Sequence, residues 1–208
     1  MKIHLPSFKY ILAGAAITGL TLSKTPSYAN NLPGKQGKDV FEKKSVSPEG
    51  TQDIQILSSA PSPDVRVCGI NKKAKIVVDL KTNTLYTYNE YGQAQSAYSI
   101  ASGKASTPTH AGVRIVSHTE TYPYRTAPSH TKRRRNPRAY GPKVIILDAL
   151  DTKTGERSSI GEFIHGNNDS SSIGKYASKG CMRMDNEVIK QLSTSVKRGD
   201  IVIILGKN

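Results

Sequence analysis

The sequence predicts a mainly β domain with one prominent helix. Short runs of β-branched and aromatic residues recur from residue 76 to the end of the chain, and turn-forming residues separate them. One segment near residue 185 instead places apolar residues at helical spacing, with signals for both helix ends. Short strands that alternate with turns are typical of β-rich architectures.

The strand candidates follow one another along the chain. Residues 76–80 and 84–88 are separated by the turn-like Lys81-Thr82-Asn83, which predicts a β-hairpin. A second turn leads to a third strand from Gln95 to Ile100, in which polar and apolar residues alternate. The remaining strand candidates are residues 112–116, 143–147, 160–164 and 201–205.

The helix candidate is defined by its two ends. Asp185 or Asn186 can accept hydrogen bonds from the amides of a first helical turn. An apolar stripe at helical spacing follows, made of Val188, Ile189, Leu192 and Val196. Lys197 and Arg198 then suit the last turn and Gly199 the end of the helix.

The first 70 residues differ in composition from the rest of the chain. Residues 1–29 combine a basic start, a short apolar stretch and a small-x-small exit, which is the arrangement of a cleaved signal peptide. Residues 30–70 are poor in aromatic residues and rich in Lys, Ser, Pro, Gly and Gln, which predicts a flexible arm or linker. A folded domain is therefore expected over residues 71–208.

The charge of the chain indicates an anionic partner or surface. Thirty Lys and Arg residues stand against sixteen Asp and Glu, a formal net charge of +14. The segment from Arg125 to Lys143 is strongly basic and contains no acid. Such a run can contact nucleic acid, but in an exported protein an anionic cell wall, or solvent alone, is the better match. Two cysteines exclude a disulfide-rich scaffold and a four-cysteine zinc site.

Cys181 and His165 are the candidate catalytic residues. Cys181 follows a glycine shortly before the predicted helix, between Lys179 and Arg183, and a positive field favours the thiolate. A thiolate with a histidine base is the usual nucleophile and base of cysteine acyl transfer. His165 ends a predicted strand upstream, and the intervening loop could return it to Cys181. The alternatives are a disulfide with Cys68, or a zinc site completed by another histidine.

From about Lys75 to Leu205 the chain resembles the catalytic domain of the L,D-transpeptidases, the YkuD family. The family usually has a histidine where this chain has Lys179. The matching segments, in chain order, are the hairpin over 76–88, the segment 101–112 with its Ser-Gly-Lys and Thr-Pro-Thr, Asn136-Pro137, Gly141-Pro142, His165-Gly166, and Ser178-x-Gly180-Cys181-x-Arg183. The resemblance implies a β-sandwich-type domain with a prominent helix after the loop that contains Cys181, here called the cysteine loop (residues 178–181).

The resemblance also implies a role for each site residue. Cys181 would attack a peptide carbonyl and form a thioester, and His165 would take the thiol proton. Backbone amides around Gly180 and Cys181 would form the oxyanion hole. Ser178 would shape the turn, and Arg183 would hold the loop or a substrate carboxylate. The reaction requires no metal or organic cofactor.

The implied function is that of an exported enzyme of the periplasm or cell wall that acts on peptidoglycan stem peptides. The acyl acceptor would be an amine on another stem or on an envelope protein. With water as the acceptor, the same residues would make an L,D-carboxypeptidase or a cross-link hydrolase. The remaining alternative is a basic wall-binding module without enzymatic activity. Nucleic acid is not among the expected partners, and no transmembrane anchor is expected after signal cleavage.

Overall fold

The computed structural model describes residues 57–207. The predicted signal peptide over 1–29 and most of the predicted arm therefore lie outside the described residues. Within residues 57–207, no helix is both long and apolar enough to cross a membrane.

The fold is organised around one eight-stranded mixed sheet with the strand order β11-β9-β8-β7-β12-β3-β4-β5. Neighbouring strands are antiparallel except for two parallel pairs, β12 with β3 and β11 with β9. The strands are β3 (Ile76–Asp79), β4 (Thr84–Tyr88), β5 (Ala94–Ser99), β7 (Gly112–Thr121), β8 (Lys143–Leu150), β9 (Arg157–His165), β11 (Met182–Arg183) and β12 (Ile201–Leu205).

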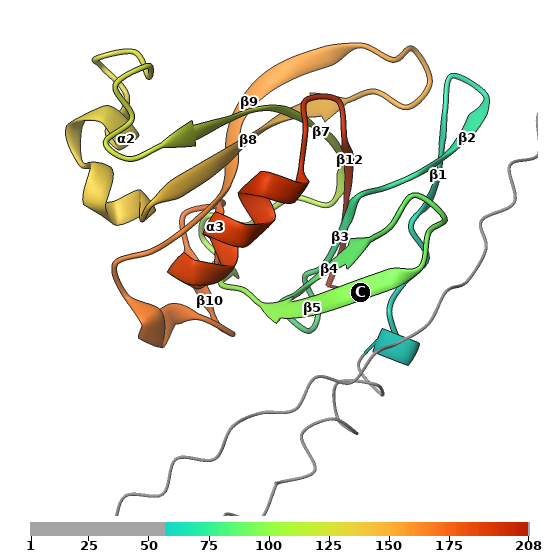
Figure 1. The fold of residues 1–208 in the computed structure, drawn as a ribbon, viewed down its shortest axis with the longest axis horizontal. Helices are drawn as coiled ribbons and strands as arrows, with labels where there is room; N and C mark the ends of the chain where they lie inside the picture. Colours follow the sequence, from blue (N-terminus) through green and yellow to red (C-terminus); the bar gives the residue numbers. More distant parts are fainter. Residues whose placement is uncertain (1–56, 208) are drawn as a thin grey trace, which may run out of the picture. The chain divides into compact units, whose positions relative to one another are not determined.

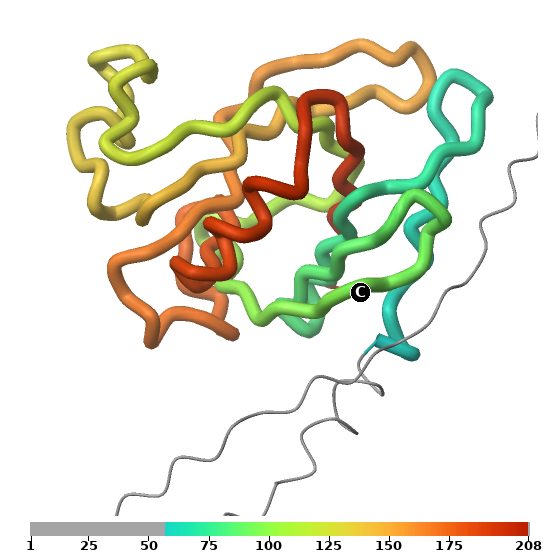
Figure 2. The backbone as a smooth tube through the Cα atoms, viewed as in Figure 1, coloured from blue at the N-terminus to red at the C-terminus, as the bar shows by residue number. Residues whose placement is uncertain are grey.

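This sheet curls strongly about its middle strands. Figures 1 and 2 show β7, β8 and β9 above β3, β4 and β5, with the helix α3 (Asn186–Ser195) in front of the space between them. The predicted mainly β class with a helix after the cysteine loop is thus confirmed. The layers expected of a sandwich-type fold, however, are the two halves of one continuous curled sheet.

The remaining elements are short. Two small sheets pair β1 (Asp64–Val67) with β2 (Ile70–Lys73), and β6 (Ser102–Gly103) with β10 (Tyr176–Ser178). The other helical segments are α2 (Lys132–Arg135) and the 3₁₀ turns η1 (Pro137–Tyr140) and η2 (Ser170–Ser172).

The main core lies inside the curl of the sheet, and α3 covers it. Side chains alternate between the two faces of a strand. In β3, Ile76 and Val78 therefore face this inner core, where they join Ile189 and Leu192 of α3. Val77 between them faces the outer side of the sheet and belongs to a second cluster. Because both faces of β3 are buried, the strand is apolar almost throughout rather than alternating.

The end of the predicted flexible arm is part of this folded unit, which differs from the boundary expected at residue 71. Residues 64–73 form the β1–β2 hairpin, and Val67 packs in the outer cluster with Val77. Carbonyl groups of the Pro-rich stretch also accept hydrogen bonds from the folded domain. Pro61 accepts from the Tyr88 hydroxyl of β4 at 2.5 Å, and Pro63 accepts from the Ala74 amide between β2 and β3 at 2.8 Å. The composition suggested a linker because these contacts use backbone atoms and only a few apolar side chains.

The helix α3 begins where the sequence predicts. The Asp185 carboxylate accepts hydrogen bonds from the amides of Glu187 and Val188 and so caps the first turn. The helix ends at Ser195, earlier than the predicted Gly199, because Val196 is extended and buries its side chain in the core. The cap fixes the start of α3 shortly after Cys181.

Candidate active site

Strand pairing places the cysteine loop beside the end of β9. His165 is the last residue of β9, and Cys181 directly precedes β11. The two strands run parallel, with Met182 opposite Ile164 and Arg183 opposite His165. His165 and Cys181 consequently line one cleft of about 790 Å³.

The residues that line the cleft come from two parts of the chain, which we call its walls. One is α2 and η1, in the connection between β7 and β8, and the other is β9 with the cysteine loop and β11. Among the predicted site residues, Ser178 and Arg183 also line the cleft, whereas Gly180 does not. No hydrogen bond joins His165 to Cys181 in the described part of the chain.

Ser178 closes the turn that presents Cys181. Its hydroxyl donates to the Cys181 carbonyl at 2.5 Å and accepts the Gly180 amide at 3.1 Å. Gly180 has φ +110, a conformation that favours glycine. The amides of Gly180 and Cys181 were the expected oxyanion donors. Since the Gly180 N–H already donates to the Ser178 hydroxyl, only the Cys181 N–H of this pair remains for an oxyanion. It donates to no acceptor among the described residues.

The cysteine loop is held by a segment to which the sequence assigned no role. The Thr109 hydroxyl donates to the Gly180 carbonyl at 2.8 Å and accepts the Gly103 amide at 2.9 Å. The Thr107 hydroxyl donates to the Ser178 carbonyl at 3.2 Å. A Cβ at Gly103 would lie under 3.0 Å from the backbone of this segment, so glycine allows the close approach. The Thr-Pro-Thr motif thus positions the cysteine loop.

The environment of His165 assigns its tautomer. Its Nδ1 lies 2.5 Å from the Gly166 carbonyl oxygen. Because a carbonyl can only accept, Nδ1 carries the proton and Nε2 is the basic nitrogen. The Tyr140 ring lies 4.8 Å from the imidazole, centroid to centroid, and restricts its orientation. His165 is 4% exposed.

A pair of asparagines fastens the loop after His165 to the start of α3. The Asn167 amide donates to the Asn186 side chain at 2.9 Å, and the Asn186 side chain donates to the Asn167 carbonyl at 3.0 Å. The Asn167 side chain donates to the Met184 carbonyl at 2.7 Å. We call Asn167 and Asn186 the asparagine clamp. It joins the segment carrying the histidine to the segment that follows the cysteine.

Comparison with known proteins accounts for this arrangement. The family model of the YkuD L,D-transpeptidase catalytic domain matches residues 73–204. The chain belongs to this family. The candidate L,D-transpeptidase YqjB of Bacillus subtilis is 31% identical over 136 residues, which cover 64% of this chain and 72% of that protein.

Several solved structures are similar to this chain, and Bd1075 shows the same fold. Bd1075 of Bdellovibrio bacteriovorus is 20% identical with a TM-score of 0.50, covering 70% of this chain and 53% of that one. An L,D-transpeptidase of Enterococcus faecium is 24% identical with a TM-score of 0.45, covering 64% of this chain and 49% of that one. The chain spans about half the length of these two proteins.

Both candidate catalytic residues of the L,D-transpeptidase domain are neutral near pH 7. Burial raises the pKa of the Cys181 thiol to about 11 and lowers the pKa of His165 to about 4. The Phe163 amide and the cations Arg183 and Lys132 act in the opposite direction on Cys181, as the positive field predicts, but burial outweighs them. The thiolate therefore forms only when a base removes the thiol proton during attack.

These pKa values predict the pH dependence of acylation. Burial disfavours the imidazolium ion, so His165 remains a base well below the usual histidine range. We expect the rate of acylation of Cys181 to be constant from about pH 5.5 to pH 8 and to fall only toward about pH 4. Stopped reactions analysed by intact-protein mass spectrometry measure this rate. An inflection near pH 6.5 would contradict the assignment.

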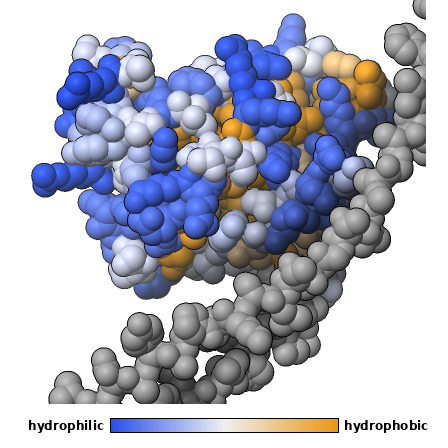
Figure 3. All heavy atoms as spheres, in the orientation of Figure 1, coloured by the Kyte–Doolittle hydropathy of each residue, from blue (hydrophilic) through white to orange (hydrophobic). Residues whose placement is uncertain are grey.

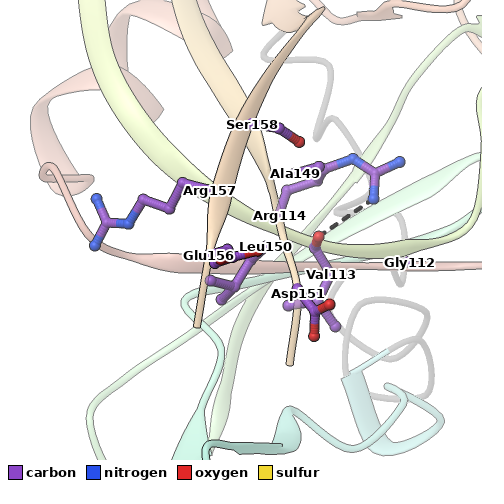
Figure 4. Close-up of a pocket in the computed structure, with 9 residues that line it drawn as sticks. All are labelled: Gly112, Val113, Arg114, Ala149, Leu150, Asp151, Glu156, Arg157 and Ser158. Carbon is purple, nitrogen blue, oxygen red and sulfur yellow. Dashed lines mark hydrogen bonds between the residues drawn. The ribbon is translucent and has the colours of Figure 1, made fainter. Parts of the chain in front are cut away.

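A second pocket, of about 670 Å³, contains neither candidate catalytic residue (Figure 4). Its Arg114 is already engaged, because the guanidinium donates to the carbonyls of Val113 and His110 and to the Glu162 carboxylate. The Glu162 contact measures 2.6 Å and both side chains are about nine-tenths buried. Arg114 thus links the segment containing His110 to β9. We therefore assign the polar side chain of this pocket a structural role.

The sequence left two alternatives for Cys181, a disulfide with Cys68 and a zinc site. Cys68 and Cys181 are both free, and Cys68 is exposed in the turn of the β1–β2 hairpin. Within residues 57–207, no three His, Cys, Asp or Glu side chains cluster as metal ligands would.

Proposed function

We propose that this chain is an exported cysteine acyltransferase that acts on peptidoglycan stem peptides. The observation that carries the proposal is the shared cleft of Cys181 and His165, in which Nε2 of His165 is the basic nitrogen. Family membership supports stem peptides as the substrate class. In this proposal, residues 1–29 direct export, and the enzyme works in the periplasm or cell wall.

The reaction proceeds in two acyl transfers. The Cys181 sulfur attacks a peptide carbonyl while His165 takes the thiol proton, and the Cys181 N–H stabilises the developing oxyanion. The carbon–nitrogen bond breaks, the leaving amine takes the proton from His165, and a thioester remains. An acceptor amine then attacks the thioester and gives its proton to His165. The new amide forms as the carbon–sulfur bond breaks and the thiol is restored.

The acceptor defines the product. We propose an amine of a second stem peptide as the acceptor, which makes the enzyme a cross-linking transpeptidase. An amine of an envelope protein would give attachment to the wall. Water would give carboxypeptidase or cross-link hydrolase activity with the same residues.

Muropeptide analysis after incubation with purified peptidoglycan distinguishes these outcomes. New dimers are expected, whereas shortened monomers would indicate a carboxypeptidase and lost dimers a hydrolase. The Cys181→Ala variant is the control, because it retains the cleft without the nucleophile. An unchanged muropeptide profile with both proteins would contradict an enzymatic function and favour a wall-binding module.

A further inference from the structure

The cleft of the candidate active site is lined by five cationic side chains. Lys132, Arg133 and Arg135 come from α2, Lys179 comes from the cysteine loop, and Arg183 comes from β11. Among the described residues that line the cleft, none is acidic. In Figure 3, hydrophilic side chains predominate at the left of the molecule, where Figure 1 places α2. Part of the basic run from Arg125 to Lys143, for which the sequence suggested contact with an anionic cell wall or with solvent, therefore borders the reaction centre.

The guanidinium of Arg133 is already paired with an acidic side chain of the protein, Glu120. This guanidinium donates two hydrogen bonds to the Glu120 carboxylate, at 2.6 and 3.1 Å, and lies 5.2 Å above the Phe163 ring. The side chain of Glu120 is 3% exposed. Burial alone would raise the pKa of Glu120, but the hydrogen bonds from Arg133 bring it below its ordinary value. Arg133 is thus neutralised by an ionised partner, and it anchors α2 beside the cleft.

The other four cations have no anion of their own. Lys132, Arg135, Lys179 and Arg183 make no side-chain hydrogen bond or ion pair with residues 57–207. Lys132, Arg135 and Lys179 are exposed, whereas Arg183 is half-buried beside His165. Like charges gathered in one cleft repel one another, and a bound anion relieves that repulsion. The cleft is therefore built to receive negative charge on both of its walls.

We propose that the cleft selects peptides with free carboxyl groups over the same peptides with carboxamides. Arg183, Lys132, Lys179 and Arg135 together bind these carboxylates. This specificity rests on the proposed function, since the ligand is the acyl donor or acceptor peptide. A carboxamide removes the charge and also turns N–H donors toward groups that can only donate. Selection thus combines attraction to one form with a mismatch against the other.

The walls favour a peptide over a phosphate polymer. Tyr140 and Phe163 line the cleft together with the cations, which suits an amphipathic ligand. The half-buried Cys181 lies at the same place and needs a carbonyl carbon to attack. A polyphosphate offers neither apolar surface nor carbonyl carbon.

Calorimetric titration of the full-length Cys181→Ala variant tests the proposal without any chemistry. The probes are two synthetic tetrapeptides of the stem type that differ only in bearing free carboxyl groups or carboxamides. We expect the free form to bind about ten-fold more tightly or better, since ten-fold corresponds to one good charged contact. Because the variant cannot form a thioester, this result does not depend on whether acyl transfer takes place.

Neighbouring arginines provide the matched control. Arg135→Gln and Lys179→Gln, one from each wall, should each reduce the preference for the free form several-fold. Arg134→Gln removes the same charge from an exposed residue of α2 that does not line the cleft, and it should leave the preference unchanged. Equal binding of the two peptides, or equal effects of Arg134→Gln and Arg135→Gln, would overturn the proposal. Tighter binding of inorganic polyphosphate than of the free peptide would overturn it in favour of a general polyanion site.

Discussion

Replacing Cys181 with alanine is expected to abolish the covalent adduct between this domain and a carbapenem. The proposed thiolate attacks the lactam carbonyl, the ring carbon–nitrogen bond opens, and the nitrogen takes the proton held by His165. The protein gains the full mass of the carbapenem as a thioester. Without the sulfur no thioester can form, and acylation should fall by about 10⁴-fold or more, to below detection.

The second cysteine supplies the control for this experiment. Cys68 is also a free thiol and is exposed, so it is the more accessible to small reagents. Cys68→Ala should form the adduct at the rate of the unmodified chain, because Cys68 lies in the β1–β2 turn and lines no part of the cleft. Intact-protein mass spectrometry distinguishes the two variants. An adduct that persists in Cys181→Ala and disappears in Cys68→Ala would reverse the assignment.

The parts of the fold that the sequence predicted are those governed by local patterns. The strand from Thr84 to Tyr88 and its partner strand consist mainly of β-branched and aromatic residues and flank a turn, and α3 has a cap at its own first turn. His165 and Cys181, the two predicted reactive residues, lie at the ends of the paired strands β9 and β11. The motifs implied that the two residues are close, and the register of these strands explains it. Local signals suffice in these cases because the deciding contacts lie close in the sequence.

The supporting contacts of the site were not predictable in this way. Thr109 reaches Gly180 across 71 positions, and Arg133 reaches back 13 positions to Glu120. Nothing in the basic composition of α2 distinguishes Arg133, which is ion-paired, from its exposed neighbour Arg134. Only the placement of Glu120 on β7 separates their roles.

The burial of the Cys181 thiol could not be predicted from the sequence either. Lys179 and Arg183 on either side of Cys181 led to the expectation of a stabilised thiolate, and the effect of Arg183 on the pKa of the thiol has that sign. The larger effect comes from burial of the thiol in the folded protein, which raises this pKa. The Cys181 thiol and the His165 imidazole are consequently both neutral. Because the thiol must lose its proton before it can attack, the proton acceptor His165 is as necessary as the nucleophile.

Replacing Gly141 with alanine is expected to damage both stability and acylation, because Gly141 lies against the asparagine clamp. Its φ is +66, and a Cβ would fall under 3.0 Å from the Asn186 side chain and from the backbone of Gly166 and Asn167. The left-handed conformation and the overpacking together should lower the free energy of unfolding by about 2 to 5 kcal/mol. The loop after His165 must move to admit the methyl group, so acylation of Cys181 should slow as well.

Gly174→Ala is the control that measures the cost of the left-handed backbone conformation without any overpacking. Gly174 also has a positive φ, +82, but a Cβ there meets nothing within 4 Å. Its loss of stability in urea unfolding should therefore be about 1 to 2 kcal/mol, from the backbone alone. Acylation by Gly174→Ala should remain near that of the unmodified chain. If both variants lost equal stability and equal acylation, backbone strain alone would explain Gly141. A loss of acylation confined to Gly141→Ala would instead show that the clamp sets the position of His165.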